Sequence, residues 1–592
     1  MVASEKKASA PPNHPCTSTA QNIKETLESI VVAFVLAFVF RAFIVEAFVI
    51  PTGSMAITLY GEQVTSTCST CGYEYARGIT QGDAVSVRSN PAYAIALRCP
   101  NCDTLVDQVP PPRIARPDSG DRILVHKWPF DIGGKLLGPK RWDVTVFKDP
   151  RDGDTNYIKR LVGLPGEILE IIDGDIYAAP FDVLRKEAPD LLEEFDQLRR
   201  EVCHLRQSPE QWDWHYWQSR YDALNERLLP YLEIQRKTPE AQKSLWFNVY
   251  NHDYLPNYQR FASQPTAWVS WEPVGPAGSL AAEAWNTTQR EITFESDSHE
   301  PLAIQFTGKP IDDYCAYNYR AQMNQSHHTL NPVGDLRLRF SWFPEAGLGS
   351  ISLEMSRDPH RFVVEIAVDG TIRIDRHHPS LPGGRERFAE MKRTPFASGK
   401  AVQIELINVD YRLSLLIDGE AVVATDYPND LPAILKRQKI GGPPPQPSLV
   451  RISAQQLRCR FRHLILERDE YYRATTQNEP WTRDPKTGQQ KNNPYCRWPG
   501  WGTWGCPIML RDGTAREYYM LGDNSPASKD SRLWWEVGPH LHPMGDEYQV
   551  GTVPEDQLIG KAFFVYWPAG YRPSWSPGIG LIPNVGRMRW IR

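Results

Sequence analysis

The sequence lacks a strong excess of either charge. Its 592 residues contain 66 lysines and arginines against 71 aspartates and glutamates, a formal net charge of −5. A general nucleic-acid binder would show a basic excess, so we expect no nucleic-acid partner. The apolar fraction of 41% and the mean hydropathy of −0.46 exclude a protein with many membrane spans. Internal repeats and a low-complexity composition are also lacking. The apolar and aromatic content still suffices for several folded domains.

One long apolar segment departs from this picture. Residues 30–40 are apolar without interruption, and the window 27–50 is long enough to cross a bilayer core, which takes about 20 helical residues. A cleaved signal peptide would have a shorter apolar region and a small-x-small cleavage site, which Phe48–Pro51 does not supply. We therefore expect an uncleaved transmembrane anchor over 25–50 after a disordered tail over 1–24. Lysines before the anchor favour a cytoplasmic N-terminus, with the rest of the chain outside the cytoplasm.

A serine and a lysine are the candidate catalytic groups. Ser54 follows the anchor directly, a position that a simple polar turn would explain equally well. A serine hydroxyl needs a base to become a nucleophile, and a lysine can serve if burial lowers its pKa. Lys159 lies in an apolar strand, Tyr157–Gly163, whereas the paired histidines of the chain lie in loop-like stretches. The pattern predicts Ser54 as nucleophile and Lys159 as general base.

In order along the chain, several segments resemble the signature boxes of bacterial type I signal peptidases. These are membrane-anchored Ser–Lys endopeptidases that remove signal peptides from exported proteins. The matching segments are the P-T-G-S-M exit from the anchor at 51–55, R-W-D-V-T-V-F at 141–147, Y-I-K-R-L-V-G-L-P-G-E at 157–167, and G-D-N with S-K-D-S-R within 522–532. Most of residues 180–465 have no counterpart in this resemblance.

The resemblance implies a role for each matching residue. Thr52, with the backbone N–H of Ser54, would form the oxyanion hole. Ser528 would hold the lysine amine, although a satisfied loop serine is the alternative. Its support would come from Asp530, Arg532, Asp523 and Asn524. For Asp530 and Arg532, a purely structural ion pair is the favoured interpretation. Shallow S1 and S3 pockets for the small side chains of Ala-x-Ala sites would be lined by Ile50, Pro51, Met55, Leu59, Tyr157 and Ile158.

Three positions depart from the family pattern. Trp142 stands where a glycine is usual, Ile57 where a proline is usual, and Ser525–Ala527 where a more polar stretch is usual. None of these changes removes a catalytic group. They leave the packing around the predicted site to be determined by the structure.

Four cysteines form two C-x-x-C pairs: Cys68 with Cys71, and Cys99 with Cys102. Four thiolates on two short knuckles are typical of a structural zinc ribbon, which we expect over residues 65–105. Two disulfides are the alternative outside the cytoplasm. We expect zinc to be structural and no cofactor to take part in catalysis.

A later loop contains Cys496 and Cys506, ten residues apart, with three tryptophans between them. A disulfide between the two cysteines is left open by this spacing. The tryptophans suggest contact with the membrane interface, and packing beneath the glycine-rich loop is the alternative.

The middle of the chain changes pattern twice. Residues 181–258 show helical periodicity and predict an inserted helical hairpin. Residues 259–465 contain short alternating runs separated by turns, which predict an antiparallel β-sandwich weakly resembling laminin-G or concanavalin-like domains. A glycan ligand, a protein ligand and a spacer role all remain open for it, because fold does not give function. The catalytic domain would then comprise 51–64, 106–180 and 466–592.

The fold class expected is therefore mainly β: a signal-peptidase-type catalytic domain on one N-terminal transmembrane helix, with zinc-ribbon, helical and β-sandwich insertions. We expect a signal peptidase I that cleaves signal peptides of exported proteins at the outer face of the plasma (inner) membrane, in contact with its lipid. A dedicated peptidase with a narrow substrate set and an inactive anchored binding protein are the alternatives.

Overall fold

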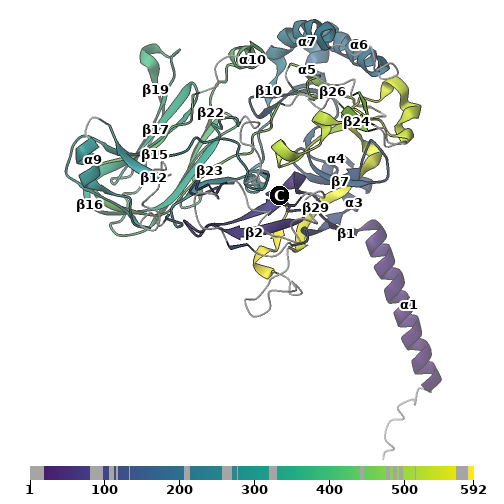
Figure 1. The fold of residues 1–592 in the computed structure, drawn as a ribbon, viewed down its shortest axis with the longest axis horizontal. Coiled ribbons are helices and arrows are strands. Elements are labelled where there is room, and N and C mark those ends of the chain that lie inside the picture. Colours follow the sequence, from purple (N-terminus) through teal and green to yellow (C-terminus); the bar gives the residue numbers. More distant parts are fainter. Residues whose placement is uncertain are drawn as a thin grey trace, which may run out of the picture.

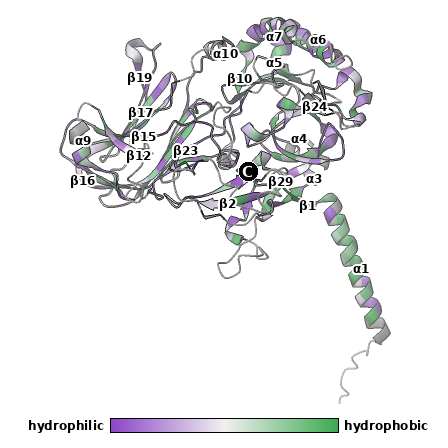
Figure 2. Cartoon of the chain, viewed as in Figure 1, coloured by the Kyte–Doolittle hydropathy of each residue, from purple (hydrophilic) through white to green (hydrophobic). Residues whose placement is uncertain are grey.

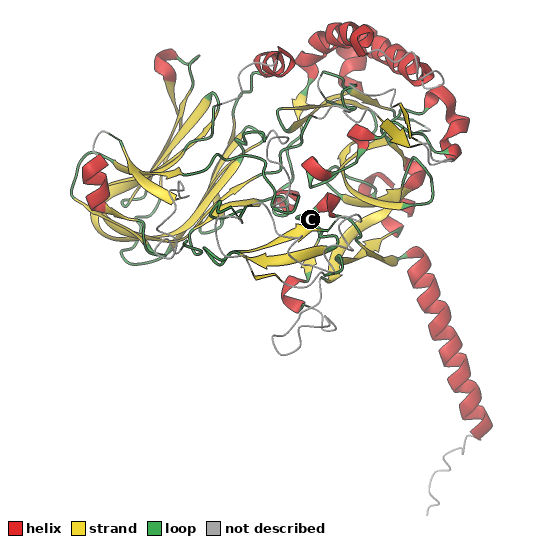
Figure 3. Cartoon of the chain, in the orientation of Figure 1, coloured by secondary structure: helices red, strands yellow, loops and turns green. Residues whose placement is uncertain are grey.

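The structure is a computed structural model. It describes residues 19–79, 98–105, 113–114, 118–132, 134–205, 214–256, 270–275, 278–318, 330–440, 446–474, 481–483, 490–492, 498–503, 505–513, 515–568 and 584–592. The chain is mainly β, as predicted, and helices are confined to α1 and to the edges of the sheets (Figure 3). Most of the predicted tail, residues 1–18, lies outside the described residues.

The N-terminal helix α1 (Thr19–Phe43) projects away from the rest of the molecule (Figure 1) and is apolar along most of its length (Figure 2). Large apolar side chains on it are exposed, among them Val31, Leu36 and Phe38. Among the described residues, no helix is both long enough and apolar enough to cross a membrane.

The prediction of one helical segment over 25–50 was wrong at both ends. The helix begins at Thr19 and ends at Phe43, and the next residues form strand β1 (Val45–Val49). β1 pairs antiparallel with β5 (Arg122–His126), Val45 opposite His126 and Val49 opposite Arg122. The alternation of apolar residues with Glu46 is typical of a half-buried strand. Pairing with β5 explains why residues 45–49 form a strand and do not continue the helix.

The predicted catalytic domain (the catalytic unit) is built on an eight-stranded antiparallel sheet. Its order is β1-β5-β29-β6-β7-β27-β28, with β30 beside β29. The strands after β5 are β6 (Val144–Lys148), β7 (Asn156–Gly163), β27 (Glu517–Leu521), β28 (Val553–Pro554), β29 (Leu558–Trp567) and β30 (Arg589–Trp590). Segments from both ends of the chain thus meet in one sheet, and the long insertion runs between β7 and β27, which are neighbouring inner strands.

Three smaller sheets surround this one. The first has the order β10-β9-β8-β26, the second β3-β2-β4, and the third pairs β24 with β25. Their strands are β2 (Gln63–Thr67), β3 (Glu74–Gly78), β4 (Arg113–Ile114), β8 (Glu167–Ile172), β9 (Asp175–Pro180), β10 (Glu233–Ile234), β24 (Trp481–Arg483), β25 (Gln490–Asn492) and β26 (Ile508–Leu510).

The described α-helices after α1 have between 4 and 17 residues. The pair α6 and α7 supplies the helical hairpin predicted after residue 181, and apolar side chains of both helices join the main core. The helices are α3 (Trp128–Ile132), α4 (Gly134–Leu137), α5 (Phe181–Glu187), α6 (Pro189–Leu205), α7 (Trp214–Leu228), α8 (Pro239–Gln242), α9 (Gly278–Ala284) and α10 (Leu431–Ile440).

The insertion forms a thirteen-stranded antiparallel sheet that branches around two long strands, β16 (Leu336–Arg357) and β23 (Val450–Arg468). The first half of β16 pairs with β20 and the second half with β17. Two groups of strands therefore diverge from the antiparallel pair of β16 and β23. The other strands are β11 (Phe247–Asn251), β12 (Ser270–Val274), β13 (Trp285–Asn286), β14 (Ile292–Ser296), β15 (Leu302–Thr307), β17 (His360–Ala367), β18 (Thr371–His377), β19 (Arg385–Lys392), β20 (Val402–Val409), β21 (Arg412–Ile417) and β22 (Glu420–Asp426).

The predicted limits of this unit, 259 and 465, were too narrow. β11 pairs with β23, and β23 continues to Arg468, so the sheet starts within the segment predicted to be helical. The laminin-G-like character remains a prediction.

Candidate active site

Ser54 lies in a 3₁₀ turn, Gly53–Met55, at the end of the segment that follows β1. Two contacts from the C-terminal part of the chain hold this turn. The Asn524 backbone N–H donates to the Ser54 carbonyl at 3.2 Å, and the Asn524 Nδ2 donates to the Gly53 carbonyl at 2.9 Å. Asn524 therefore fixes the turn that carries Ser54, the predicted nucleophile.

Lys159 lies on the central strand β7, between β6 and β27. Its Nζ is within hydrogen-bonding distance of Ser54 Oγ, and the residue is only 2% exposed. Burial disfavours the ammonium form and lowers the pKa of Lys159 to about 8, although Asp530 acts in the opposite direction. A serine hydroxyl beside an amine that is neutral in mild base is an arrangement that can generate a nucleophile.

Ser528 lies beside this pair. It is 5% exposed, and within the described chain its Oγ makes no hydrogen bond. A Cβ added to Gly522 would collide with both Ser528 Oγ and the Ser54 carbonyl, so the two serines approach each other across a glycine that no other residue can replace. The role of Ser528 in holding the Lys159 amine stays a prediction.

The next residues form a buried ion pair. Arg532 donates to Asp530 through Nε at 2.8 Å and through Nη2 at 2.7 Å, and neither side chain is exposed. Asp530 also accepts from the Gly522 backbone N–H at 3.0 Å. Burial alone would raise the pKa of Asp530, but Arg532 holds it below its usual value. This pair fixes the loop that carries Ser528.

Asp523, predicted as support, has a partner that the sequence reasoning did not single out. Arg160 donates to it through Nε at 2.7 Å and Nη2 at 2.6 Å, and both side chains are fully buried. Arg160 also donates to the Trp142 carbonyl at 2.7 Å. Since Lys159 and Arg160 are neighbours on β7, one strand presents the candidate base to Ser54 and a structural cation to Asp523. The unusual charge of Lys-Arg inside an apolar strand was the signal available.

The predicted oxyanion and pocket residues lie around the nucleophile at different depths. Thr52 and Pro51 are exposed, and Tyr157 and Ile158 are half-buried on β7. Three others, Ile50, Met55 and Leu59, are packed into the core beneath the nucleophile turn with Ile123 and Val125. The structure therefore leaves the exposed and half-buried residues accessible, while the other three form the floor of the site.

Two departures from the family pattern have structural counterparts. Trp142 has a φ of 76°, the region where glycine is favoured, and its buried ring donates from Nε1 to the Arg236 carbonyl at 2.8 Å. The peptide bond between Ala56 and Ile57 is cis. The backbone at Trp142 is therefore one that would suit the usual glycine.

The C-terminal cysteine and tryptophan predictions resolve in part. Cys506 is buried and has no disulfide partner among the described residues. Cys496 and Trp504 lie outside the described residues, so a Cys496–Cys506 disulfide stays a prediction. Trp498 and Trp501 are buried and packed against Trp535, so the membrane-interface hypothesis was wrong for these two rings. A tryptophan ring has a large apolar surface, and packing these rings against Trp535 removes that surface from solvent.

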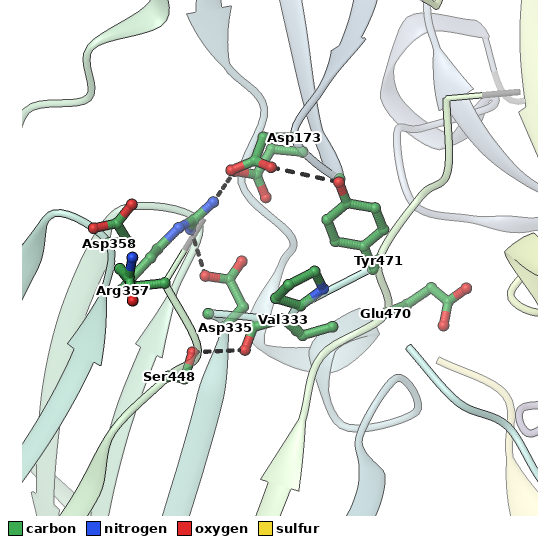
Figure 4. A pocket seen from close by; sticks show the side chains of 13 residues that line it. Asp173, Val333, Asp335, Arg357, Asp358, Ser448, Glu470 and Tyr471 are labelled. Carbon is green, nitrogen blue, oxygen red and sulfur yellow. Dashed lines mark hydrogen bonds and ion pairs between the residues drawn. The ribbon is translucent and has the colours of Figure 1, made fainter. Parts of the chain in front are cut away.

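Two groups of side chains outside this site bring together atoms that could hold a metal. The first is the set of four cysteines predicted as ligands, and the second comprises Asp175, Asp335 and Asp410. Arg357 forms ion pairs with both Asp175 and Asp335, and Figure 4 shows it beside Asp335. Lys237 contacts Asp410 at 2.9 Å. These cations already compensate the carboxylates, so the second group is an ionic contact between the catalytic unit and the insertion.

A serine held against a buried amine, with a rigid support loop, defines a site of the kind that nucleophilic hydrolases use. The chain matches the family model described as signal peptidase, peptidase S26, over residues 23–106, 116–201 and 407–567, more than half of its length. The chain therefore belongs to the signal peptidase family, peptidase S26, a family of hydrolases.

Curated relatives agree with this membership. Signal peptidase I of Rickettsia typhi is 29% identical over 168 residues, which cover 28% of this chain and 47% of the relative. Signal peptidase I of Pseudomonas fluorescens is 43% identical over 60 residues, 9% of this chain and 21% of the relative. The chain spans less than half the length of these relatives.

Solved structures give weaker similarities. The carbohydrate-binding module CBM66 from Bacillus subtilis has a TM-score of 0.22 and 12% identity, covering 34% of this chain and 96% of its own. The laminarinase catalytic domain of Thermotoga maritima MSB8 has a TM-score of 0.24 and 10% identity, covering 38% and 98%. Similarities of this degree do not define the fold or ligand of the insertion.

Proposed function

We propose that this chain is a signal peptidase I, a serine endopeptidase that uses Ser54 as nucleophile and Lys159 as general base. The observation that carries the proposal is the contact between the buried Lys159 amine and Ser54 Oγ. Membership in the signal peptidase family supports it. Substrates would be the signal peptides of exported proteins, cleaved after Ala-x-Ala sites.

The chemistry follows from the positions of the two groups. Neutral Lys159 takes the proton of Ser54 Oγ as this oxygen attacks the scissile carbonyl carbon. The developing oxyanion is stabilised by the Ser54 backbone N–H and the Thr52 hydroxyl. When the C–N bond breaks, the protonated Lys159 gives its proton to the leaving amine. Lys159 then deprotonates a water that cleaves the acyl–serine ester, which releases the signal peptide and regenerates Ser54.

Attachment to a membrane is proposed for α1. Its exposed apolar side chains have no protein partner among the described residues, and the nucleophile turn begins ten residues after the helix ends at Phe43. Placement beside the lipid would bring Ser54 to the level where a signal peptide leaves the bilayer. In this arrangement the catalytic unit would lie at the outer face of the plasma (inner) membrane.

Peptide cleavage tests the proposal. The full-length protein in detergent is expected to cut a signal-peptide mimic ending in Ala-x-Ala after the second alanine, as mapped by mass spectrometry. Ser54→Ala, which removes only the nucleophilic oxygen, should leave no cleavage above background. Replacement of both alanines by leucine in the peptide should also abolish cutting, because shallow pockets exclude large side chains.

A serine-directed acylating probe distinguishes the alternatives. A wild type that leaves the peptide intact but is labelled at Ser54 would point to a narrow substrate set. A wild type that neither cuts nor reacts would support an inactive anchored binding protein and contradict the proposal. A glycan or protein ligand for the insertion stays a prediction.

A further inference from the structure

Four buried thiols lie together at one end of the β2–β3 hairpin. All four sulfurs, from Cys68, Cys71, Cys99 and Cys102, lie within 4.8 Å of one another, and all are free. The Sγ atoms of Cys68 and Cys102 are 3.7 Å apart, as are those of Cys71 and Cys99. A disulfide would place its sulfurs about 2.05 Å apart. Four thiolates around Zn²⁺, with Zn–S bonds of about 2.3 Å, stand about 3.75 Å apart at the corners of a tetrahedron.

The two C-x-x-C segments have the same backbone turn. In the first, the Gly72 N–H donates to the Cys68 carbonyl at 3.0 Å, and Gly72 has a φ of 77°. In the second, the Asp103 N–H donates to the Cys99 carbonyl at 3.0 Å, and Asp103 has a φ of 56°. Asn101 additionally points its backbone N–H at Cys99 Sγ, 3.4 Å away. Two matching knuckles turn their sulfurs toward one centre.

We propose that these four cysteines bind one Zn²⁺ as a structural site. A set of four thiolates selects zinc or iron over hard cations such as Ca²⁺ and Mg²⁺, and a closed, buried tetrahedron has no open position for catalysis. The metal therefore holds the fold and takes no part in the cleavage step.

The site joins the nucleophile segment to the insertion. Its first knuckle belongs to β2–β3, the hairpin that follows Ser54 by nine residues. Its second knuckle contacts the insertion: the Asn101 side chain donates to the Asn251 and Tyr254 carbonyls at 3.3 and 3.2 Å. Lys309 donates to the Pro100 carbonyl at 2.8 Å. Zinc would thus fasten a loop anchored on the insertion to the hairpin that follows Ser54.

Metal content of the full-length protein tests this proposal. Elemental analysis of wild type purified without chelators is expected to give about one zinc per chain. Cys102→Ser should lose the metal and lower the midpoint of thermal unfolding, and a strong chelator should do the same to the wild type. Cys459→Ala, which changes a buried free thiol in β23, should retain the zinc.

Two results would overturn it. One is a metal-free wild type, whose intact mass then shows either two disulfides, by the loss of four hydrogens, or four free thiols. The other is a zinc content that Cys102→Ser leaves unchanged. Iron at the same stoichiometry would overturn the assignment to zinc. The wild-type measurement decides even where the variant does not fold.

A second, independent observation concerns the insertion residues beside the nucleophile. Asn318 and Asn524 exchange hydrogen bonds: Asn318 Nδ2 donates to Asn524 Oδ1 at 2.6 Å, and Asn524 Nδ2 donates to Asn318 Oδ1 at 2.8 Å. Asn524 in turn holds the Gly53 and Ser54 carbonyls. The Tyr317 ring covers Gly53 so closely that a Cβ there would collide with it.

We infer that Asn318 is a positioning residue for Ser54, an inference that rests on the proposed function. Without Asn318, Asn524 loses the partner that fixes its amide plane, and the nucleophile turn gains freedom. Asn318→Ala should lower kcat about fivefold, with KM within about twofold, since a neutral hydrogen bond is worth about 1 kcal/mol. The control Asn286→Ala changes an exposed asparagine of the same insertion and should cleave like wild type.

A double-mutant cycle separates positioning from a general loss of stability. In an Asn524→Ala background, Asn318→Ala should have no further effect on kcat, because its only route to Ser54 is removed. Additive losses, or an unchanged kcat in the single variant, would refute the inference. Acylation of Ser54 by a serine-directed probe gives the same comparison if peptide cleavage itself fails, so the two failures are distinguishable.

Discussion

Lys159→Met is expected to reduce kcat by about 10³-fold or more while the protein stays folded. The base that activates Ser54 is lost, and general-base catalysis contributes about 10²–10⁴-fold. Methionine keeps the length of the side chain at a position that is only 2% exposed, and it has no amine to accept a proton. Burial lowers the pKa of Lys159 to about 8, so the unfolded chain binds the proton more tightly than the folded one. The free energy of unfolding at neutral pH should therefore rise in the variant, not fall.

The wild-type pH profile provides the matching measurement. Only the neutral amine can accept the proton of Ser54, so kcat/KM should rise with pH and level off above an inflection near 8. Lys140→Met, at an exposed lysine, should retain wild-type rates and the same profile. A Lys159→Met protein that still cleaves, or a rate that falls between pH 7 and 9, would show that another group serves as base.

Ser54 and Lys159 could be singled out from the sequence because each carries a local signal. Lys159 stands inside an apolar strand, where a cation is out of place, and Ser54 follows a long apolar run in a turn-forming segment. The structure brings the two into contact although they are 105 residues apart. The family boxes supply what periodicity cannot, namely which distant segments share a sheet.

Residues whose importance depends on a distant partner were missed or misplaced. Arg160 acquires its role from Asp523, 363 positions away, and Asn318 from Asn524, 206 positions away. An arginine or asparagine alone gives no sign of such a partner. The burial of Met55 and Leu59 was likewise not evident from the sequence, because it depends on packing against Ile123 and Val125, more than 60 residues later.

The end of the anchor was misplaced for a similar reason. Val45–Val49 continues the apolar run of α1, and hydrophobicity alone does not distinguish helix from a half-buried strand over five residues. Pairing with β5, more than 70 residues later, selects the strand. The buried tryptophans Trp498 and Trp501 show the same limit, because their partner Trp535 lies outside the local loop.

Arg532→Met should destabilise the protein by about 3–5 kcal/mol, the range for breaking a fully buried ion pair. The cost arises because Asp530 remains buried and charged after its bidentate partner is removed. Arg532 also donates to Ser525 Oγ at 2.7 Å and to the Arg473 carbonyl at 2.8 Å, and both acceptors would be left without that donor. Urea titration of the variant and wild type measures the difference.

An exposed pair of the same chemistry gives the control. Arg185 and Asp512 are 2.8 Å apart with about half of each side chain exposed, so Arg185→Met should cost at most about 1 kcal/mol. Equal losses of unfolding free energy in Arg532→Met and Arg185→Met would mean that the buried Asp530–Arg532 pair stabilises the protein no more than an exposed pair. A large loss for Arg532→Met alone, together with a lower kcat in the fraction that remains folded, would tie the support loop to the site. Asp530 accepts a hydrogen bond from the Gly522 N–H, and Gly522 lies between Ser528 and Ser54. A shift of Asp530 after the loss of Arg532 should therefore move Gly522 and, with it, the Ser54 turn.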